Sequence, residues 1–217
     1  VLKREPVMNS VFSRILKALC VVTAVASLSA CGGASSTVNP FVPTRVIGLG
    51  DAYNDVGSGV NAPFTVRGTG AVSTVVEQVA ALFGVGSSGT FVDADTYTNL
   101  PASGVFSYAV GGALINSGAD SLADQIVSLS DDVGGAFTSS DLIVIAAGTQ
   151  DIKANYTTTA AETAAVLLEA QVKILLAKGA KHILILQPLE LSVTPYGSAN
   201  RNSIPLDVTS SPTVKFN

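Results

Sequence analysis

Charged side chains are scarce in this 217-residue sequence: they make up 13% of it, whereas 47% of the residues are hydrophobic. This composition excludes an intrinsically disordered chain and a basic nucleic-acid-binding module. Cysteine is nearly absent as well. Its two copies, Cys20 and Cys31, lie at the start of the chain, so no thiol pair remains for a disulfide in the rest. The sequence therefore predicts one globular domain without disulfides.

The first 30 residues have the features of an export signal. Arg14 and Lys17 form a positively charged flank, and residues 18–28 are an apolar run too short for a permanent transmembrane helix. The segment 28–31, Leu-Ser-Ala-Cys, resembles the lipobox of bacterial lipoproteins, in which the signal is cut before a cysteine that then carries the lipid. The resemblance implies an exported lipoprotein anchored through a lipidated Cys31, and Gly32 after it implies the outer membrane. The alternative is that Cys31 is a small residue near an ordinary cleavage site.

Removal of residues 1–30 leaves an acidic protein. Four of the 12 basic and one of the 16 acidic side chains lie in that segment, so the remaining 187 residues carry 8 basic and 15 acidic groups, a net charge of −7. An acidic surface repels phosphate backbones and anionic headgroups, which excludes nucleic acid as a partner and assigns any membrane attachment to the lipid. Residues 31–43 are rich in Gly, Ser and Pro without periodicity and predict a flexible tether.

Residues 44–217 alternate short apolar runs with segments of helical period, which predicts a parallel sheet covered by helices. Strands are expected at 44–49, 105–110, 141–147 and 182–186, and helices at 72–83, 122–133 and 159–178. Residues 84–104 are turn-rich, and no further helix is expected after Pro188. Ligands of open parallel sheets collect at the carboxyl ends of the strands, so the candidate site lies in segments 50–57, 108–113 and 147–152.

These three segments, in this order, resemble the sequence blocks of the SGNH or GDSL family of esterases and lipases. The matches to Gly-Asp-Ser-Leu-Ser-Asp-x-Gly, to Asn-Tyr-Ala-x-Gly-Gly-Ala and to Gly-x-Asn-Asp are Gly50, Asp51, Asp55, Gly57; Tyr108, Ala109, Gly111, Gly112, Ala113; and Gly148, Asp151. The resemblance covers roughly residues 45–195 and implies a three-layer α/β/α flavodoxin-like fold. It also implies that the family's last strand and helix are missing, so the strand at 182–186 is expected to have an unpaired, apolar edge.

The groups that carry out catalysis in this family are missing from the chain. Ala52 stands at the position of the nucleophilic serine, next to Asp51, and a methyl group cannot attack a carbonyl carbon. The family's base lies in an Asp-x-x-His block near the C-terminus, whereas the only histidine here is His182, with Gly179 three residues before it. We therefore interpret His182 as structural and expect the site to be catalytically impaired.

The positions that stabilise an oxyanion in the family are still filled by hydrogen-bond donors. The backbone N–H groups of Ala52 and Gly112 do not depend on a side chain, and Gln150 carries the same amide as the family's asparagine on an arm one methylene longer. The resemblance thus implies an acyl ester or a carboxylate as the ligand, and it implies no cofactor and no metal.

Three other hypotheses remain open at this point. The chain is a non-catalytic binding or structural lipoprotein that uses the residual cleft, or it is a gene fragment whose missing part held the base block. A dinucleotide-binding fingerprint beginning at Gly48 and Gly50 is disfavoured, because Tyr53 stands where the third glycine is needed.

Overall fold

The computed structural model describes residues 40–57, 72–92, 97, 99–134, 136–154, 157–189 and 191–199. All of these except Pro40 belong to one compact unit that begins at Phe41. The predicted signal segment, Cys31 and most of the predicted tether lie outside the described residues. None of the helices in the described ranges is long and apolar enough to cross a membrane.

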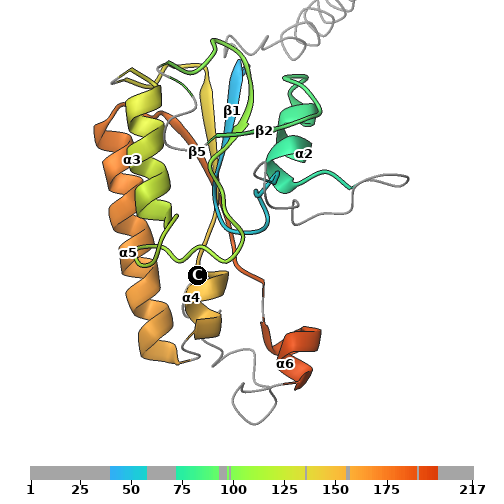
Figure 1. Ribbon diagram of the computed structural model, residues 1–217, viewed down its shortest axis with the longest axis vertical. Helices are drawn as coiled ribbons and strands as arrows, with labels where there is room; N and C mark the ends of the chain where they lie inside the picture. The colour runs from blue at the N-terminus through green and yellow to red at the C-terminus, as the bar shows by residue number, and fades with distance from the viewer. Residues whose placement is uncertain are drawn as a thin grey trace, which may run out of the picture. The chain divides into compact units, whose positions relative to one another are not determined.

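A five-stranded, all-parallel sheet forms the centre of this unit (Figure 1). Its strands lie in the order β2-β3-β1-β4-β5 and are β1 (Arg45–Gly50), β2 (Thr90–Phe91), β3 (Gly104–Ser107), β4 (Asp141–Ala146) and β5 (His182–Leu186). Without the two-residue β2, the chain order across the sheet is second, first, third, fourth, which is the flavodoxin-like arrangement. The predicted α/β fold is confirmed.

Helices cover both faces of the sheet. Figure 1 shows α3 (Leu122–Asp132) and α5 (Thr158–Ala177) together on one side and α2 (Val75–Leu82) on the other. The strands alternate accordingly: Ile47 and Ile143 pack in the cluster that contains the apolar stripes of α3 and α5, whereas Val46 and Val144 pack with Val76 of α2. Both central strands are therefore buried on both faces, as their uninterrupted apolar sequence predicts.

Four short elements depart from the sequence-based expectations. The turn-rich stretch 84–104 contains β2, and α4 (Thr149–Ala154) follows β4 where only a loop was expected. The prediction that no helix follows Pro188 is wrong, because the chain forms η1 (Leu191–Val193) and α6 (Pro195–Ala199) there. Thr194 accepts a hydrogen bond from the Gly197 N–H and Pro195 occupies the first helical position, an arrangement that favours a helix start.

β3 ends three residues earlier than predicted. The main chain still runs beside β1, with the Tyr108 N–H bonded to the Gly48 carbonyl and the Val110 N–H to the Gly50 carbonyl. Regular pairing stops at Ser107, whose hydroxyl donates to the Asn54 carbonyl and accepts from the Ala109 N–H. These bonds turn the chain away from the sheet toward the candidate site.

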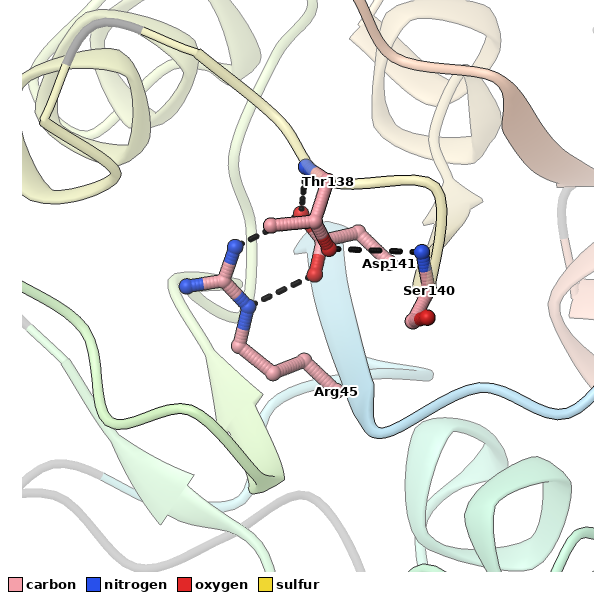
Figure 2. A network of polar contacts seen from close by, with 4 residues as sticks. All are labelled: Arg45, Thr138, Ser140 and Asp141. Carbon is pink, nitrogen blue, oxygen red and sulfur yellow. Dashed lines mark hydrogen bonds and ion pairs between the residues drawn. The ribbon is translucent and has the colours of Figure 1, made fainter.

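A buried ion pair joins β1 and β4 at their amino ends (Figure 2). The Arg45 guanidinium donates two hydrogen bonds of 2.6 Å each to the Asp141 carboxylate, and the Thr138 N–H donates another of 2.7 Å. Burial alone would raise the pKa of Asp141, but the bonds from Arg45 and Thr138 hold it below its ordinary value. The network fixes the register of the two central strands at the end opposite the candidate site.

β5 forms one edge of the sheet. It pairs with β4, and no strand among the described residues pairs with its other side. The side chains of Leu184 and Ile185 are 42% and 46% exposed, which is high for apolar residues of a strand. The expected apolar edge is therefore present in the described part of the chain.

Candidate functional site

The three segments singled out in the sequence meet at the carboxyl ends of β1, β3 and β4. Asp55 accepts hydrogen bonds from the Gly57 N–H at 2.8 Å and from the Gly111 N–H at 2.6 Å, so it ties the first segment to the second. The Asp151 carboxylate accepts the Ile115 N–H at 3.2 and 3.3 Å, which ties the third segment to the chain just after the second. The site thus lies where the strand order reverses between β1 and β4, the usual ligand position in this architecture.

Gly50 and two buried amides set the turn after β1. Gly50 has a φ of 107°, and a Cβ at this position would collide with the Ala146 carbonyl oxygen, so only glycine fits. The Gln125 side chain of α3 pairs with the Gly50 main chain, accepting its N–H at 2.7 Å and donating to its carbonyl at 2.9 Å. Asn54 donates to the Leu49 and Val144 carbonyls, each at 2.9 Å, and so bridges β1 and β4.

The expected oxyanion donors all lie on these segments. Ala52 is half-buried in the turn after β1, Gly112 is exposed in the turn after β3, and Gln150 is half-buried in the first turn of α4. In the described part of the chain, neither the N–H of Ala52, nor that of Gly112, nor the Gln150 side-chain amide has a hydrogen-bond partner. These donors are free to bind a ligand oxygen.

Acidic side chains surround these donors. Burial raises the pKa of Asp51 to about 7; the Tyr53 N–H opposes this rise, the nearby Asp151 adds to it, and Lys153 lowers it. Burial likewise raises the pKa of Asp151. The backbone N–H groups of Ile115 and of Asp151 itself donate to the carboxylate and partly offset this rise. Within the described residues, Asp51 Oδ2 and Asn54 Oδ1 are buried without hydrogen-bond partners. A proton on Asp51 turns one of these two acceptors into a donor.

His182 and Tyr108 lie apart from the donors and have other partners. The His182 ring stacks on Phe41 with centroids 3.8 Å apart, at the amino end of β5. The register of β1, β4 and β5 puts His182 on the order of 15–20 Å from Ala52. The buried Tyr108 donates its hydroxyl proton to Asp132 at 2.6 Å, at the end of α3. Neither side chain can serve as a base at position 52.

The described ranges contain no group of three or more His, Cys, Asp or Glu side chains that could hold a metal ion. The site offers hydrogen-bond donors for an oxygen atom, supplied by Ala52, Gly112 and Gln150. The neighbouring carboxyl groups of Asp51 and Asp151 have raised pKa values.

Sequence reasoning missed the residues that hold the site in place. Gln125 gave one signal: it is a polar residue on the apolar stripe that Leu122, Ile126 and Leu129 form, and such a residue needs a buried partner. Asn54 gave none, because a polar residue after a glycine is typical of any turn. Asp55 was recognised as a match of the family block, but its bond to Gly111 shows what it does.

The sequence matches no protein-family model and no curated protein.

Proposed function

We propose that this chain is a relative of the SGNH esterases that binds an acyl ester without cleaving it. The observation that carries the proposal is the set of unpartnered donors at the carboxyl ends of β1, β3 and β4, from Ala52, Gly112 and Gln150. Donors of this kind bind a carbonyl oxygen when they converge at about 3 Å from it.

Cleavage needs a nucleophile and a base, and the described residues near the donors supply neither. The Ala52 methyl is inert, and the only histidine of the sequence lies at the other end of the sheet. Asp51, next to Ala52 in the sequence, is only 1% exposed and is therefore shielded from a ligand. Binding is therefore the activity that the site supports.

The electrostatics favour an ester over a carboxylate. Among the described residues, Asp51, Asp55 and Asp151 lie on the same three segments as the donors, and Lys153 is the cation that acts on Asp51, so a neutral carbonyl meets less repulsion than an anion does. The product of ester hydrolysis, a carboxylate, is accordingly a poorer ligand than the ester itself.

Calorimetric titration of the full chain in detergent, with methyl butyrate and with sodium butyrate, tests this proposal. We expect the ester to bind more tightly than the anion, with no methanol released in a parallel NMR time course. Gln150→Ala should weaken ester binding by about 3- to 15-fold, the value of one hydrogen bond. Thr90→Val, on the far edge of the sheet, is the matched control and should bind as the wild type does. Absence of ester binding, or equal binding of the anion, contradicts the proposal.

We further propose that Cys31 carries a lipid that anchors the protein in the outer membrane. The support is the sequence of residues 14–32 alone. Intact-mass measurement should find a mature protein that begins at an acylated Cys31; an unmodified N-terminus after cleavage contradicts the anchor.

A further inference from the structure

The outer edge of β5 lacks the features that usually keep one sheet from pairing with another. Edge strands are commonly protected by charged side chains, by proline or by a bulge. The sequence of β5, His-Ile-Leu-Ile-Leu, contains no proline, acidic residue, lysine or arginine, and each of its residues pairs with one residue of β4. Among the described residues, no strand pairs with its other side. The edge therefore presents a regular row of main-chain N–H and carbonyl groups.

Apolar side chains flank this edge on both faces of the sheet. Leu184 pairs with Val144 and so lies on the face that α2 covers, whereas Ile185 pairs with Ile145 and lies on the face that α3 and α5 cover. The side chains of Leu184 and Ile185 are 42% and 46% exposed. A strand added to this edge would bury apolar surface on both faces as well as pair the main chain.

The helix α5 adds an apolar flank beside the same edge. Figure 1 shows α5 next to α3, and Leu167 lines a hollow together with Leu114, in the segment that leads into α3. Leu176 follows Leu167 by about two and a half turns of an α-helix, so it points to the opposite flank, on the side of the β5 edge. The Leu176 side chain is 52% exposed. A partner at this edge would cover it.

The charges around β5 favour a second copy of this chain as the partner. Residues 31–217 carry a net charge of −7, so two copies repel each other over much of their surface. Residues 170–189 are an exception, with three lysines and no acidic residue. In an antiparallel pair centred on Leu184, Lys181 of one copy lies opposite Gln187 of the other, whereas a parallel in-register pair would place Lys181 beside Lys181. Antiparallel pairing is therefore the arrangement that the charges permit.

We propose that the protein forms a two-fold symmetric dimer in which the β5 strands of two copies pair antiparallel. The symmetry axis is perpendicular to the sheet, so Leu184 packs against its counterpart on the α2 face and Ile185 packs against Ile183 of the second copy on the α5 face. The two five-stranded sheets become one continuous sheet, joined by about four to six main-chain hydrogen bonds. The Leu176 flanks of the two α5 helices lie beside the paired strands.

Disulfide formation between single cysteines tests the register. The background is the full chain with Cys20→Ser and Cys31→Ser, which removes both native cysteines. Leu184→Cys should cross-link with copper phenanthroline and give a dimer band on non-reducing gels, because opposite Cβ atoms of paired strands lie about 4.5–5.5 Å apart. Ile185→Cys is the matched control on the same strand, with similar exposure. Its two copies lie diagonally, about 7–8 Å apart, and should give little or no dimer band.

A cysteine pair checks the same register from the other side of the axis. Adding Ile183→Cys to Ile185→Cys should restore cross-linking, because position 183 of each copy lies opposite position 185 of the other. Equal cross-linking of the two single variants would show that the contact has no fixed register, and it would overturn the proposal.

Sedimentation equilibrium of the full chain in density-matched detergent tests the dimer itself. The wild type should have twice the monomer mass. Leu176→Lys should raise the dissociation constant by about 10-fold or more, because each copy loses the burial of a leucine side chain. Leu82→Lys, at the end of α2 and 85% exposed, is the control and should dimerise as the wild type does. A monomer, or oligomers that grow beyond the dimer, overturns the proposal, and an unchanged dimer of Leu176→Lys overturns the place of α5 in it.

Discussion

The side chain at position 52 determines whether the turn after β1 carries a hydroxyl group. Ala52→Ser places a hydroxyl in the turn after β1, but the only histidine of the sequence, His182, lies at the other end of the sheet and out of hydrogen-bond reach. We expect no hydrolysis of p-nitrophenyl butyrate beyond what oxyanion donors supply without a catalytic triad, about 10³- to 10⁴-fold over water in a serine protease. The measurement is release of p-nitrophenol by the 217-residue variant.

A control variant and a serine-directed inhibitor test the interpretation of this result. Ala52→Gly adds no hydroxyl and should give the same rate as the wild type. Rapid hydrolysis by the serine variant that a serine-directed inhibitor blocks would show that another residue acts as the base, and that the interpretation of His182 as structural is wrong.

Asp51 should make the protein less stable as the pH rises, which is the opposite of the usual effect of a folded-state aspartate. Its pKa of about 7 in the fold lies above the ordinary aspartate value of 3.8, so the unfolded chain loses this proton at a lower pH than the folded chain does. The stability that this proton provides is complete below pH 4 and is lost as the pH rises to 7. Because one pKa unit corresponds to about 1.4 kcal/mol, the wild type should lose about 2–4 kcal/mol over this range relative to Asp51→Asn.

Urea denaturation of both proteins at pH 4.5, 6 and 8 measures this difference. Asp131→Asn removes a charge from an exposed position of α3 and serves as the control, with a stability that follows the wild type at each pH. A wild type and an Asp51→Asn variant whose stabilities run parallel across the three pH values would show that Asp51 is ionised throughout.

At the scale of the elements, the buried Arg45–Asp141 pair joins β1 to β4 through two hydrogen bonds. Its two partners are 6% and 2% exposed. Arg45→Met leaves a buried carboxylate without its cation, so we expect a loss of about 3–5 kcal/mol in the free energy of unfolding. The double variant Arg45→Met with Asp141→Leu should recover most of this free energy of unfolding. The remaining loss comes from the Thr138 N–H, which no longer has Asp141 as its acceptor. A double variant no more stable than the single one would indicate that the charges themselves order the strands.

Elements with a strong periodic signal and clear ends could be predicted from the sequence. β5 lies at the predicted residues, and α3 begins after Ser121, which caps it, and ends before Gly134. The short elements could not be predicted, because α4 has six residues and β2 has two, too few for a period to show. α6 could have been found from Thr194 and Pro195, a capping residue followed by proline.

The position of the candidate site could be predicted from the sequence, whereas the residues that hold its loops in place could not. The carboxyl ends of parallel strands meet by topology, so the three loops follow from the strand pattern. The Gln125 side chain reaches Gly50 across 75 residues of sequence, and the pairing of such distant residues depends on how α3 packs on the sheet.

At the scale of the whole molecule, the outer edge of β5 governs association. Residues 31–217 should form oligomers or be poorly soluble, because Leu184 and Ile185 expose apolar surface beside main-chain groups that no described strand pairs. Sedimentation velocity measures this. Ile185→Lys should shift the distribution toward monomer, whereas Val166→Lys, an equal change on exposed α5, should not. A wild type that is a monodisperse monomer with a cooperative melt would mean that the edge is covered.

Two positions in the turn after β1, Gly50 and Ala52, differ in how strongly the fold restricts their residue type. Any side chain at Gly50 strikes β4, so a substitution there removes the fold and with it every function of the protein. Ala52, two residues on, is half-buried and has no comparable backbone requirement for its residue type. Selection for a folded protein alone would preserve the glycine and leave position 52 to drift. The Gly-Asp turn after β1 is therefore explained by what the fold requires, and its presence alone does not indicate a reaction.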